Sequence, residues 1–215
     1  MIKKIIITTT LLTTTLFSAF NANISSIPPD IKNRMVRGNS WREGCPVPLY
    51  NLRYLQLVYH DFNGKDRLGE MIVHKDIADD VIYIMEKLYN IGYPIRQMRL
   101  VSDFHANDWK SIDVDNTSAF NCRNVTGSKK KWSNHAYGKA IDINPIENPY
   151  ISKKGHISHK ASQKYRRRVH HGYRTSADKA LILQNDKITK IFKQYGFRWG
   201  GDWKYTKDYQ HFDKR

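Results

Sequence analysis

Hydrophobic positions in the first half of the chain predict two strands followed by a helix. Two apolar-rich stretches, 52–62 and 69–74, flank the turn-forming residues 63–66, as expected for consecutive strands joined by a turn. Apolar residues then recur three and four positions apart up to Tyr89, which places them on one face of a helix that Asp76 can cap. We therefore expect a strand–turn–strand–helix unit here.

The remaining chain gives shorter signals of the same two kinds. Strands are predicted at 97–102, 140–144 and 210–213, and a second amphipathic helix at 185–195. Strands and helices fall in separate runs rather than in regular alternation, and the sequence shows no internal repeat. This pattern predicts an α+β fold.

The amino terminus resembles a secretory signal peptide. Residues 1–4 are basic, and an apolar run with interspersed Thr and Ser extends to Phe20, followed by small residues. A membrane-anchoring helix is the alternative, but the run is shorter than the roughly 20 residues that span a bilayer. We expect residues 1–22 to be removed on export, to the periplasm or the cell exterior.

Two further segments differ from the rest in composition. Residues 23–40 are polar and lack a steady apolar period, which predicts an arm or linker before a folded domain at 41–215. Within that domain, 151–177 contains eight Lys or Arg, four His and no acidic residue. We interpret it as a basic insertion, either an element that docks polyanions or a solvated, partly disordered loop.

Composition limits the class of protein. The chain has 215 residues, a hydrophobic fraction of 40% and a formal charge of +16, which fits one folded domain and excludes disorder and a polytopic membrane protein. The positive charge favours anionic partners such as cell-wall polymers, lipopolysaccharide or nucleic acid. Lys129–Lys131 and Arg166–Arg168 suggest nucleic acid, but no known binding motif surrounds them and basic runs are usually solvated faces.

The chain contains two cysteines, Cys45 and Cys122. Two cysteines exclude a four-cysteine zinc module, so a metal site here has to use His and carboxylates. In an oxidising compartment the pair can form a disulfide, and closing this loop would stabilise the fold by roughly 4 kcal/mol. Two separate buried thiols are the alternative.

Three residues in the carboxy-terminal half of the chain can form a catalytic zinc site. Such a site takes three His or carboxylate ligands and leaves one position open for water. A turn at Gly138 lets His135 and Asp142 approach one another, and His211 can arrive on another strand. Asp142 lies among apolar residues, where an unpaired carboxylate is costly to bury. An isolated histidine is more often structural, so the spacing by itself leaves this alternative open.

Amide hydrolysis needs two further groups beside the metal ligands. A base has to take the proton from the water and pass it to the leaving amine, and Asp208, three residues before His211, is in position to do so. A second cation has to stabilise the oxyanion of the tetrahedral intermediate, and Arg123 is the candidate.

These residues form motifs that resemble the zinc D-alanyl-D-alanine carboxypeptidase and L-alanyl-D-glutamate endopeptidase family. The resemblance extends from about Cys45 to Asp213. It rests on two separated motifs in the expected order, Ser133-x-His135-x-x-Gly138-x-Ala140-x-Asp142 and the acid-x-x-His motif Asp208 to His211, and on the segments 115–123, 144–150 and 196–203.

The resemblance implies a central antiparallel sheet flanked by helices, as in hedgehog-like D-Ala-D-Ala peptidases, with one zinc ion. It assigns His135, Asp142 and His211 as metal ligands, Asp208 as general base, and Arg123 as the arginine that steadies the substrate carbonyl. Ser133 is similar to a serine of the motif that supports substrate binding or the surroundings of the ligands. Trp203 is placed near the site, where it either contacts substrate or packs in the core.

The resemblance implies a peptidase acting on the stem peptides of peptidoglycan, and with the predicted signal peptide we expect an exported monomer. We expect a D-alanyl-D-alanine carboxypeptidase, with an L-alanyl-D-glutamate or cross-link endopeptidase as the alternative. Carboxypeptidase members usually carry Glu where this chain has Asp208, whereas some wall endopeptidases carry Asp. A non-catalytic wall-binding protein is the alternative from another class, and the intact acid at Asp208 argues against it. Segment 151–177 matches nothing in the family.

Overall fold

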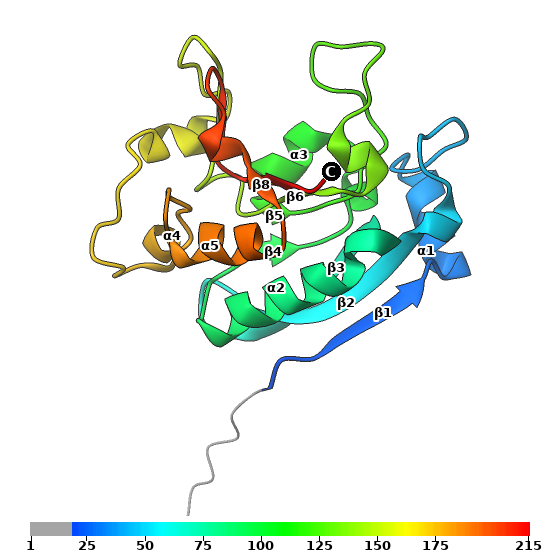
Figure 1. Ribbon diagram of the computed structural model, residues 1–215, viewed down its shortest axis with the longest axis horizontal. Helices are drawn as coiled ribbons and strands as arrows, with labels where there is room; N and C mark the ends of the chain where they lie inside the picture. Colours follow the sequence, from blue (N-terminus) through cyan, green and yellow to red (C-terminus); the bar gives the residue numbers. More distant parts are fainter. Residues whose placement is uncertain (1–18) are drawn as a thin grey trace, which may run out of the picture.

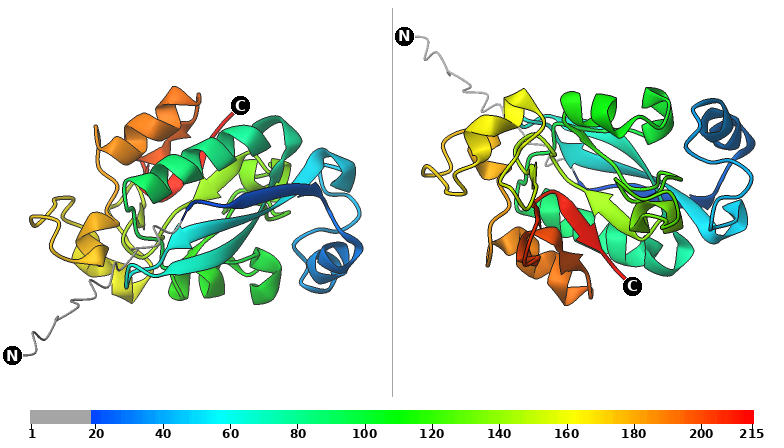
Figure 2. Two further views of the ribbon diagram at one scale, coloured as in Figure 1. Left: turned by 90° about the horizontal axis from the view of Figure 1, so that it is seen from below. Right: turned by 90° about the horizontal axis from the view of Figure 1, so that it is seen from above.

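The computed structural model describes residues 19–215, so most of the predicted signal peptide, 1–22, lies outside the described residues. A long sheet, β1–β2–β3, lies on one side of the molecule, and a shorter sheet, β6–β10–β8, lies on the other, with helices α2 and α5 beside them (Figures 1 and 2). The expected α+β class with antiparallel sheets is confirmed. Within the described residues, no helix is both long and apolar enough to cross a membrane.

The long sheet contains the predicted strand–turn–strand unit. Strands β2 (Leu52–His60) and β3 (Asp66–His74) pair antiparallel from Leu52 opposite His74 to His60 opposite Asp66. The turn closes on Asp61, whose carboxylate accepts hydrogen bonds from the backbone N–H groups of Asn63 and Lys65 at 2.8 and 2.9 Å. These bonds satisfy turn donors that would otherwise face solvent.

Residues 23–40 do not form the predicted arm or linker. They contain β1 (Ala22–Ser26), which pairs antiparallel with β2, and α1 (Pro29–Arg37). Helix α1 buries Ile31 and Met35 on one face, a two-residue stripe too short to stand out as a period in the sequence. The folded region therefore begins well before Trp41.

Helix α2 (Ala78–Asn90) follows β3 through a 3-10 helix at Lys75–Ile77. Asp76 does not cap α2 as predicted, because the residue before the first turn of that helix is Ile77. Asp76 lies inside the 3-10 helix, and its backbone N–H donates to Nδ1 of His74 at 3.3 Å. The apolar face predicted for this helix is buried, with Ile84 in the core and Ile82 at its edge.

The shorter sheet places the candidate site. Strand β10 (His211–Asp213) lies between β6 (Ala140–Asp142) and β8 (Arg198–Trp199), antiparallel to both. Helix α5 (Lys187–Gln194) packs on it, and the ring of Phe192 stacks on that of Phe212 at a centroid distance of 3.8 Å. Phe212 and the opposed Ile141 are fully buried. Because side chains alternate along a strand, their neighbours Asp142 and His211 project from the other face.

The remaining elements are short. The predicted strand at 97–102 is extended over its first two residues only and continues as a 3-10 helix, Val101–Phe104. Strands β4 and β5 pair parallel, and β7 and β9 pair antiparallel. These elements are β4 (Gln97–Met98), β5 (Asn116–Thr117), β7 (Tyr150–Ile151), β9 (Lys207–Asp208), α3 (Asp108–Asp113) and α4 (Ser176–Lys179). Further 3-10 helices span Leu49–Asn51, Asn134–Tyr137, Lys160–Tyr165 and Gly200–Asp202.

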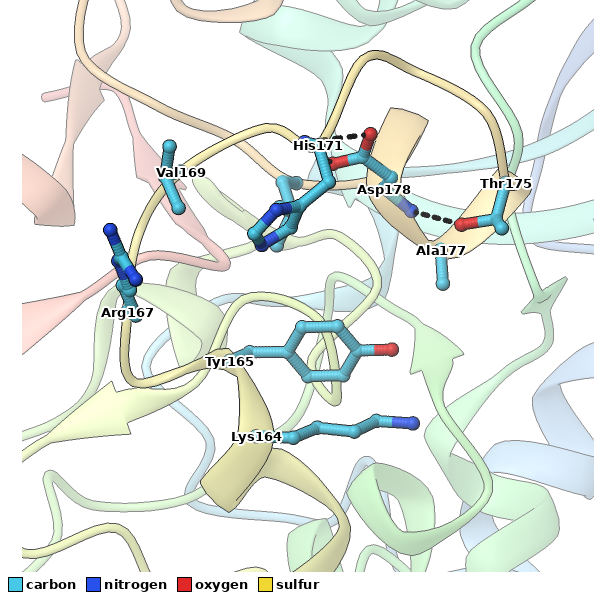
Figure 3. A pocket seen from close by; sticks show the side chains of 9 residues that line it. Lys164, Tyr165, Arg167, Val169, His171, Thr175, Ala177 and Asp178 are labelled. Atoms are coloured by element: carbon cyan, nitrogen blue, oxygen red, sulfur yellow. Dashed lines mark hydrogen bonds between the residues drawn. The ribbon is translucent and has the colours of Figure 1, made fainter.

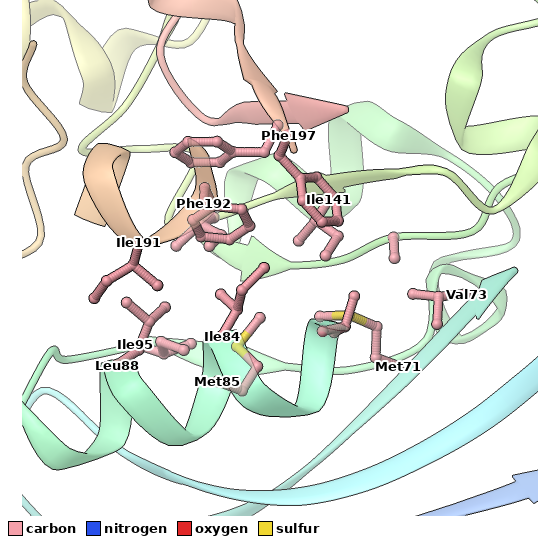
Figure 4. Packing of buried hydrophobic residues seen from close by; sticks show 14 of the residues in the cluster. Met71, Val73, Ile84, Met85, Leu88, Ile95, Ile141, Ile191, Phe192 and Phe197 are labelled. Atoms are coloured by element: carbon pink, nitrogen blue, oxygen red, sulfur yellow. The ribbon is translucent and has the colours of Figure 1, made fainter. Parts of the chain in front are cut away.

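One apolar core joins the two sheets through their helices. Figure 4 shows side chains of β3 and α2 facing those of α5, β6 and the segment before β8, among them Met71, Ile84, Leu88, Ile141, Phe192 and Phe197. A second cluster lies between α1, β2 and the segment around Cys122. There Cys45 and Cys122 form a disulfide across 77 residues, with their Cα atoms 5.8 Å apart. The first of these clusters includes Ile141 of β6 and Phe212 of β10, so it fixes the two strands that carry Asp142 and His211.

Candidate metal centre and active site

The structure brings His135, Asp142 and His211 together. Asp142 on β6 and His211 on β10 are directly opposite one another in the antiparallel register, and His135 comes from the 3-10 helix Asn134–Tyr137. One ligand atom from each residue lies within 4.8 Å of the other two. The turn between His135 and Asp142 and the arrival of His211 on another strand agree with the sequence prediction.

The spacing of the three ligand atoms fits a zinc ion. Nε2 of His135 lies 3.2 Å from Nδ1 of His211 and 3.2 Å from Oδ2 of Asp142, and Nδ1 of His211 lies 3.0 Å from Oδ1 of Asp142. In a tetrahedral zinc site with bonds of about 2.0–2.2 Å, neighbouring ligand atoms are roughly 3.3 Å apart. Lone pairs this close repel unless a proton or a cation lies between them. The donor set therefore suits zinc.

The main chain fixes which nitrogen of His135 faces the site. Its Nδ1 lies 2.6 Å from the carbonyl oxygen of Ala119, and because a carbonyl only accepts, Nδ1 carries the proton. Nε2 is then left with a free lone pair, the form that binds a metal. The sequence analysis missed Ala119, because a backbone carbonyl leaves no residue signature.

Ser133 and Gly138 shape the turn that carries His135. The hydroxyl of Ser133 caps the 3-10 helix by accepting the backbone N–H of His135 at 3.3 Å. Gly138 ends the helix with φ +67°, and a Cβ there would lie 2.7 Å from the backbone nitrogen of His74. Only glycine meets both the conformation and the space at this position. Ser133 is buried, so its hydroxyl supports the turn that carries His135.

The charges in the cluster stabilise one another. Burial alone would raise the pKa of Asp142, but the contacts with His135 and His211 outweigh burial and hold that pKa far below its ordinary value. Burial lowers the pKa of His211, yet contact with Asp142 and the nearby charge of Asp208 raise it overall. Asp142 is therefore an anion, and the site attracts a cation.

Asp208 lies next to this cluster on β9. Burial raises the pKa of its carboxyl to about 6, opposed by His211 and reinforced by the charge of Asp142. Its Oδ1 accepts a hydrogen bond from the side-chain amide of the buried Gln210 at 3.1 Å. The carboxyl is thus ionised at pH 7 and can still hold a proton at slightly lower pH, which suits proton transfer.

Arg123 and Trp203 occupy different surroundings. Arg123 lies beside the turn that carries His135, because its carbonyl oxygen accepts a hydrogen bond from the backbone N–H of Ser133 at 3.1 Å. Its guanidinium forms an ion pair with Asp108, which the sequence analysis did not identify. The ring of Trp203 lies beside that of His211, with centroids 5.4 Å apart. Trp203 is partly exposed, so it borders the metal centre rather than filling the core.

Segment 151–177 is folded against the domain. Partly buried Arg168 donates to the carbonyls of Glu147 and Ile182 and to the side chain of Asn148, at 2.5, 2.9 and 2.7 Å. The carboxylate of Asp178 accepts a hydrogen bond from the backbone N–H of His171, as Figure 3 shows at the edge of a pocket of about 310 Å³. The segment makes one short strand pair, β7 with β9, beside Asp208.

The α+β fold thus places two histidines and an aspartate that could hold a metal ion beside a carboxyl of raised pKa. Residues 126–214 match the family model described as D-alanyl-D-alanine carboxypeptidase, so this part of the chain is similar to that peptidase family. The match confirms the family resemblance and includes His135, Asp142, Asp208 and His211, while Arg123 precedes it. No solved structure matched the chain significantly.

Proposed function

We propose that this protein is an exported, zinc-dependent D-alanyl-D-alanine carboxypeptidase that acts on the stem peptides of peptidoglycan. The observation that carries the proposal is the His135–Asp142–His211 cluster with Asp208 beside it, inside the region that matches a peptidase family. The family description supplies the substrate bond. Export accords with the composition of the amino terminus and with the disulfide.

His135, Asp142 and His211 would hold the zinc through Nε2, a carboxylate oxygen and Nδ1. When bound, zinc polarises a carbonyl oxygen and lowers the pKa of a bound water to about 7. Three protein ligands leave a position open for water or substrate, as in catalytic rather than structural zinc sites.

Asp208 would move the proton. As a carboxylate it accepts a proton from the attacking water, and as a carboxylic acid it returns that proton to the nitrogen of the leaving amine. A pKa raised to about 6 by burial supports both steps near neutral pH, because neither protonation state is far out of reach. Gln210 holds one oxygen of this carboxyl through a hydrogen bond from its side-chain amide.

Arg123 would stabilise negative charge on the substrate carbonyl oxygen. Its present partner, Asp108, also accepts a hydrogen bond from the side chain of Asn121 at 2.7 Å. Asp108 therefore keeps a donor when the guanidinium turns to substrate.

The decisive experiment is mass spectrometry of purified muropeptides incubated with the protein, with chelator and with zinc added back. Loss of one alanine from pentapeptides is expected. The chelator should prevent this loss, and added zinc should restore it. A cut between L-alanine and D-glutamate, or across a cross-link, would replace the carboxypeptidase by an endopeptidase, which the aspartate at position 208 also suits. No zinc-dependent product would contradict the proposal and favour a wall-binding protein.

Two substitutions separate the roles of the site residues. Asp208→Ala is expected to abolish turnover and to leave zinc bound, because Asp208 is not a ligand. His211→Ala is expected to lose both zinc and turnover. Metal content by atomic emission and turnover on the same preparations measure this, and near-normal turnover in the Asp208 variant would remove the mechanism.

A further inference from the structure

Two lysine-bearing rims rise from the same side of the molecule, with the short sheet β6–β10–β8 between them (Figure 1). We define the first rim as loop 124–132 and the second as the neighbouring loops 152–156 and 203–206. Six lysines lie on these rims, and all six side chains are exposed: Lys129, Lys130, Lys131, Lys153, Lys154 and Lys204.

The first rim is rooted beside His135. Asn124 pairs with Trp132 across the base of the loop, and the N–H of Val125 donates to the carbonyl of Lys131 at 2.8 Å. The next pair inward, Arg123 with Ser133, adjoins the turn that carries the histidine. The three lysines are therefore held at the end of a closed loop.

The second rim is rooted beside Asp208. Strands β7 and β9 bring Tyr150 opposite Asp208, and both loops of the rim extend from this pair. The ammonium groups of Lys153 and Lys204 lie 5.2 and 5.4 Å from the ring centroid of Tyr205, whose side chain is 64% exposed. The tyrosine thus gathers two lysines from separate segments into one cationic surface.

No acidic residue compensates these charges. Among the described residues, none of the six rim lysines forms an ion pair, whereas Lys139, Lys193 and Lys214 elsewhere do. Asp202, the acid closest in sequence to the second rim, pairs with Lys193 at 2.7 Å. Like charges held together without a counter-charge raise the free energy of the empty surface, and an anionic ligand relieves it.

We propose that the two rims bind side-chain carboxylates of the peptide substrate, so that this enzyme selects an acidic peptide chain. This inference rests on the proposed peptidase function. The rim lysines would then determine specificity, because their loops adjoin the turn that carries His135 and the strand pair that contains Asp208.

The test compares two synthetic peptides with the same scissile bond, one with free side-chain carboxylates and one with those groups amidated. The variants are K129Q/K130Q/K131Q for the first rim and K153Q/K154Q/K204Q for the second. A matched control, K87Q/K179Q/K190Q, removes three exposed lysines from α2, α4 and α5 and changes the net charge equally.

Each rim variant is expected to lower kcat/KM about ten-fold on the acidic peptide, through KM, and to leave the amidated peptide unchanged. The control variant is expected to behave as wild type, and added salt to reduce the difference. Equal loss on both peptides, equal loss in the control, or no loss would overturn the inference. Unchanged peptide kinetics with weaker retention on a phosphate-bearing wall polymer would assign the rims to that polymer instead.

A binding measurement separates this inference from the proposed function. If wild-type protein with zinc cleaves neither peptide, the proposed function fails. Calorimetric titration of the acidic peptide into the Asp208→Asn protein, with and without the rim substitutions, still reports on the rims. Affinity that falls about ten-fold with either set supports the inference, and unchanged affinity overturns it.

Discussion

The side-chain amide of Asn134 donates a hydrogen bond to the carboxylate of Asp213. Asn134 adjoins His135, and Asp213 is two residues beyond His211 on the same face of β10, so this bond ties together the segments that carry both histidines. Arg198 on β8 contacts the same carboxylate, which is 1% exposed. A buried charge held by two donors keeps a fixed position.

Asn134→Ala is expected to weaken zinc binding about ten-fold, because the turn carrying His135 loses its tie to β10. Titration against a competing chelator of known affinity measures the change. Asn90→Ala, an exposed substitution at the end of α2, is the control. Unchanged zinc affinity in the Asn134 variant would show that the main-chain contact to Ala119 positions His135 by itself.

Gln210→Met is expected to shift the acid side of the pH–rate profile to higher pH. The amide of Gln210 donates to Asp208 and so favours its ionised form, and its loss raises the pKa of that carboxyl. Turnover should fall about three-fold at pH 6 and stay near wild type at pH 8. A uniform loss across the pH range would indicate misplacement of Asp208 rather than a changed proton affinity.

Glu147→Gln is expected to stabilise the protein in alkaline solution. Glu147 is 2% exposed and shares a buried site with Asp115, and burial raises its pKa from 4.5 to about 9. The folded protein keeps a proton that the unfolded chain releases above about pH 4.5, so stability falls as pH rises through this window. Glutamine is neutral at every pH and removes that loss.

Thermal unfolding of wild type and Glu147→Gln between pH 5 and pH 9 checks this. The variant should unfold at a similar temperature at pH 5 and at a temperature higher by about 3 °C at pH 9. Parallel curves for the two proteins would show that Glu147 does not hold the proton in the folded state.

Replacing both cysteines by serine, C45S/C122S, is expected to reduce the free energy of unfolding by roughly 4 kcal/mol, since the disulfide closes a loop of 77 residues. Denaturant unfolding measures the loss, and wild type unfolded under reducing conditions should match the variant. Zinc affinity should change little, because the three ligands lie in segments outside the bridge. A stability equal to wild type would mean that packing around Cys122 alone holds α1 and β2.

Local patterns were sufficient for much of the fold. The turn at 63–66 and the apolar face of the helix after it depend on neighbours in sequence, and the structure confirms both. The prediction of an arm or linker at 23–40 was wrong, because β1 pairs with the edge of β2. No local sequence pattern predicts that pairing. The strand predicted at 97–102 is shortened for the same reason, since a strand lasts only as long as its partner.

The sequence by itself determined the kinds of side chain at the site, the glycine turn between His135 and Asp142, and the family resemblance, because these are properties of residue type and spacing. Only the tertiary structure decided that Asp142 lies opposite His211, that Ala119 sets the proton on His135, and that Arg123 rests on Asp108. Register, backbone acceptors and the partner of a charge depend on distant segments that meet once the core has packed. The two cationic rims have the same origin, since lysines far apart in sequence become one surface only when β7 pairs with β9.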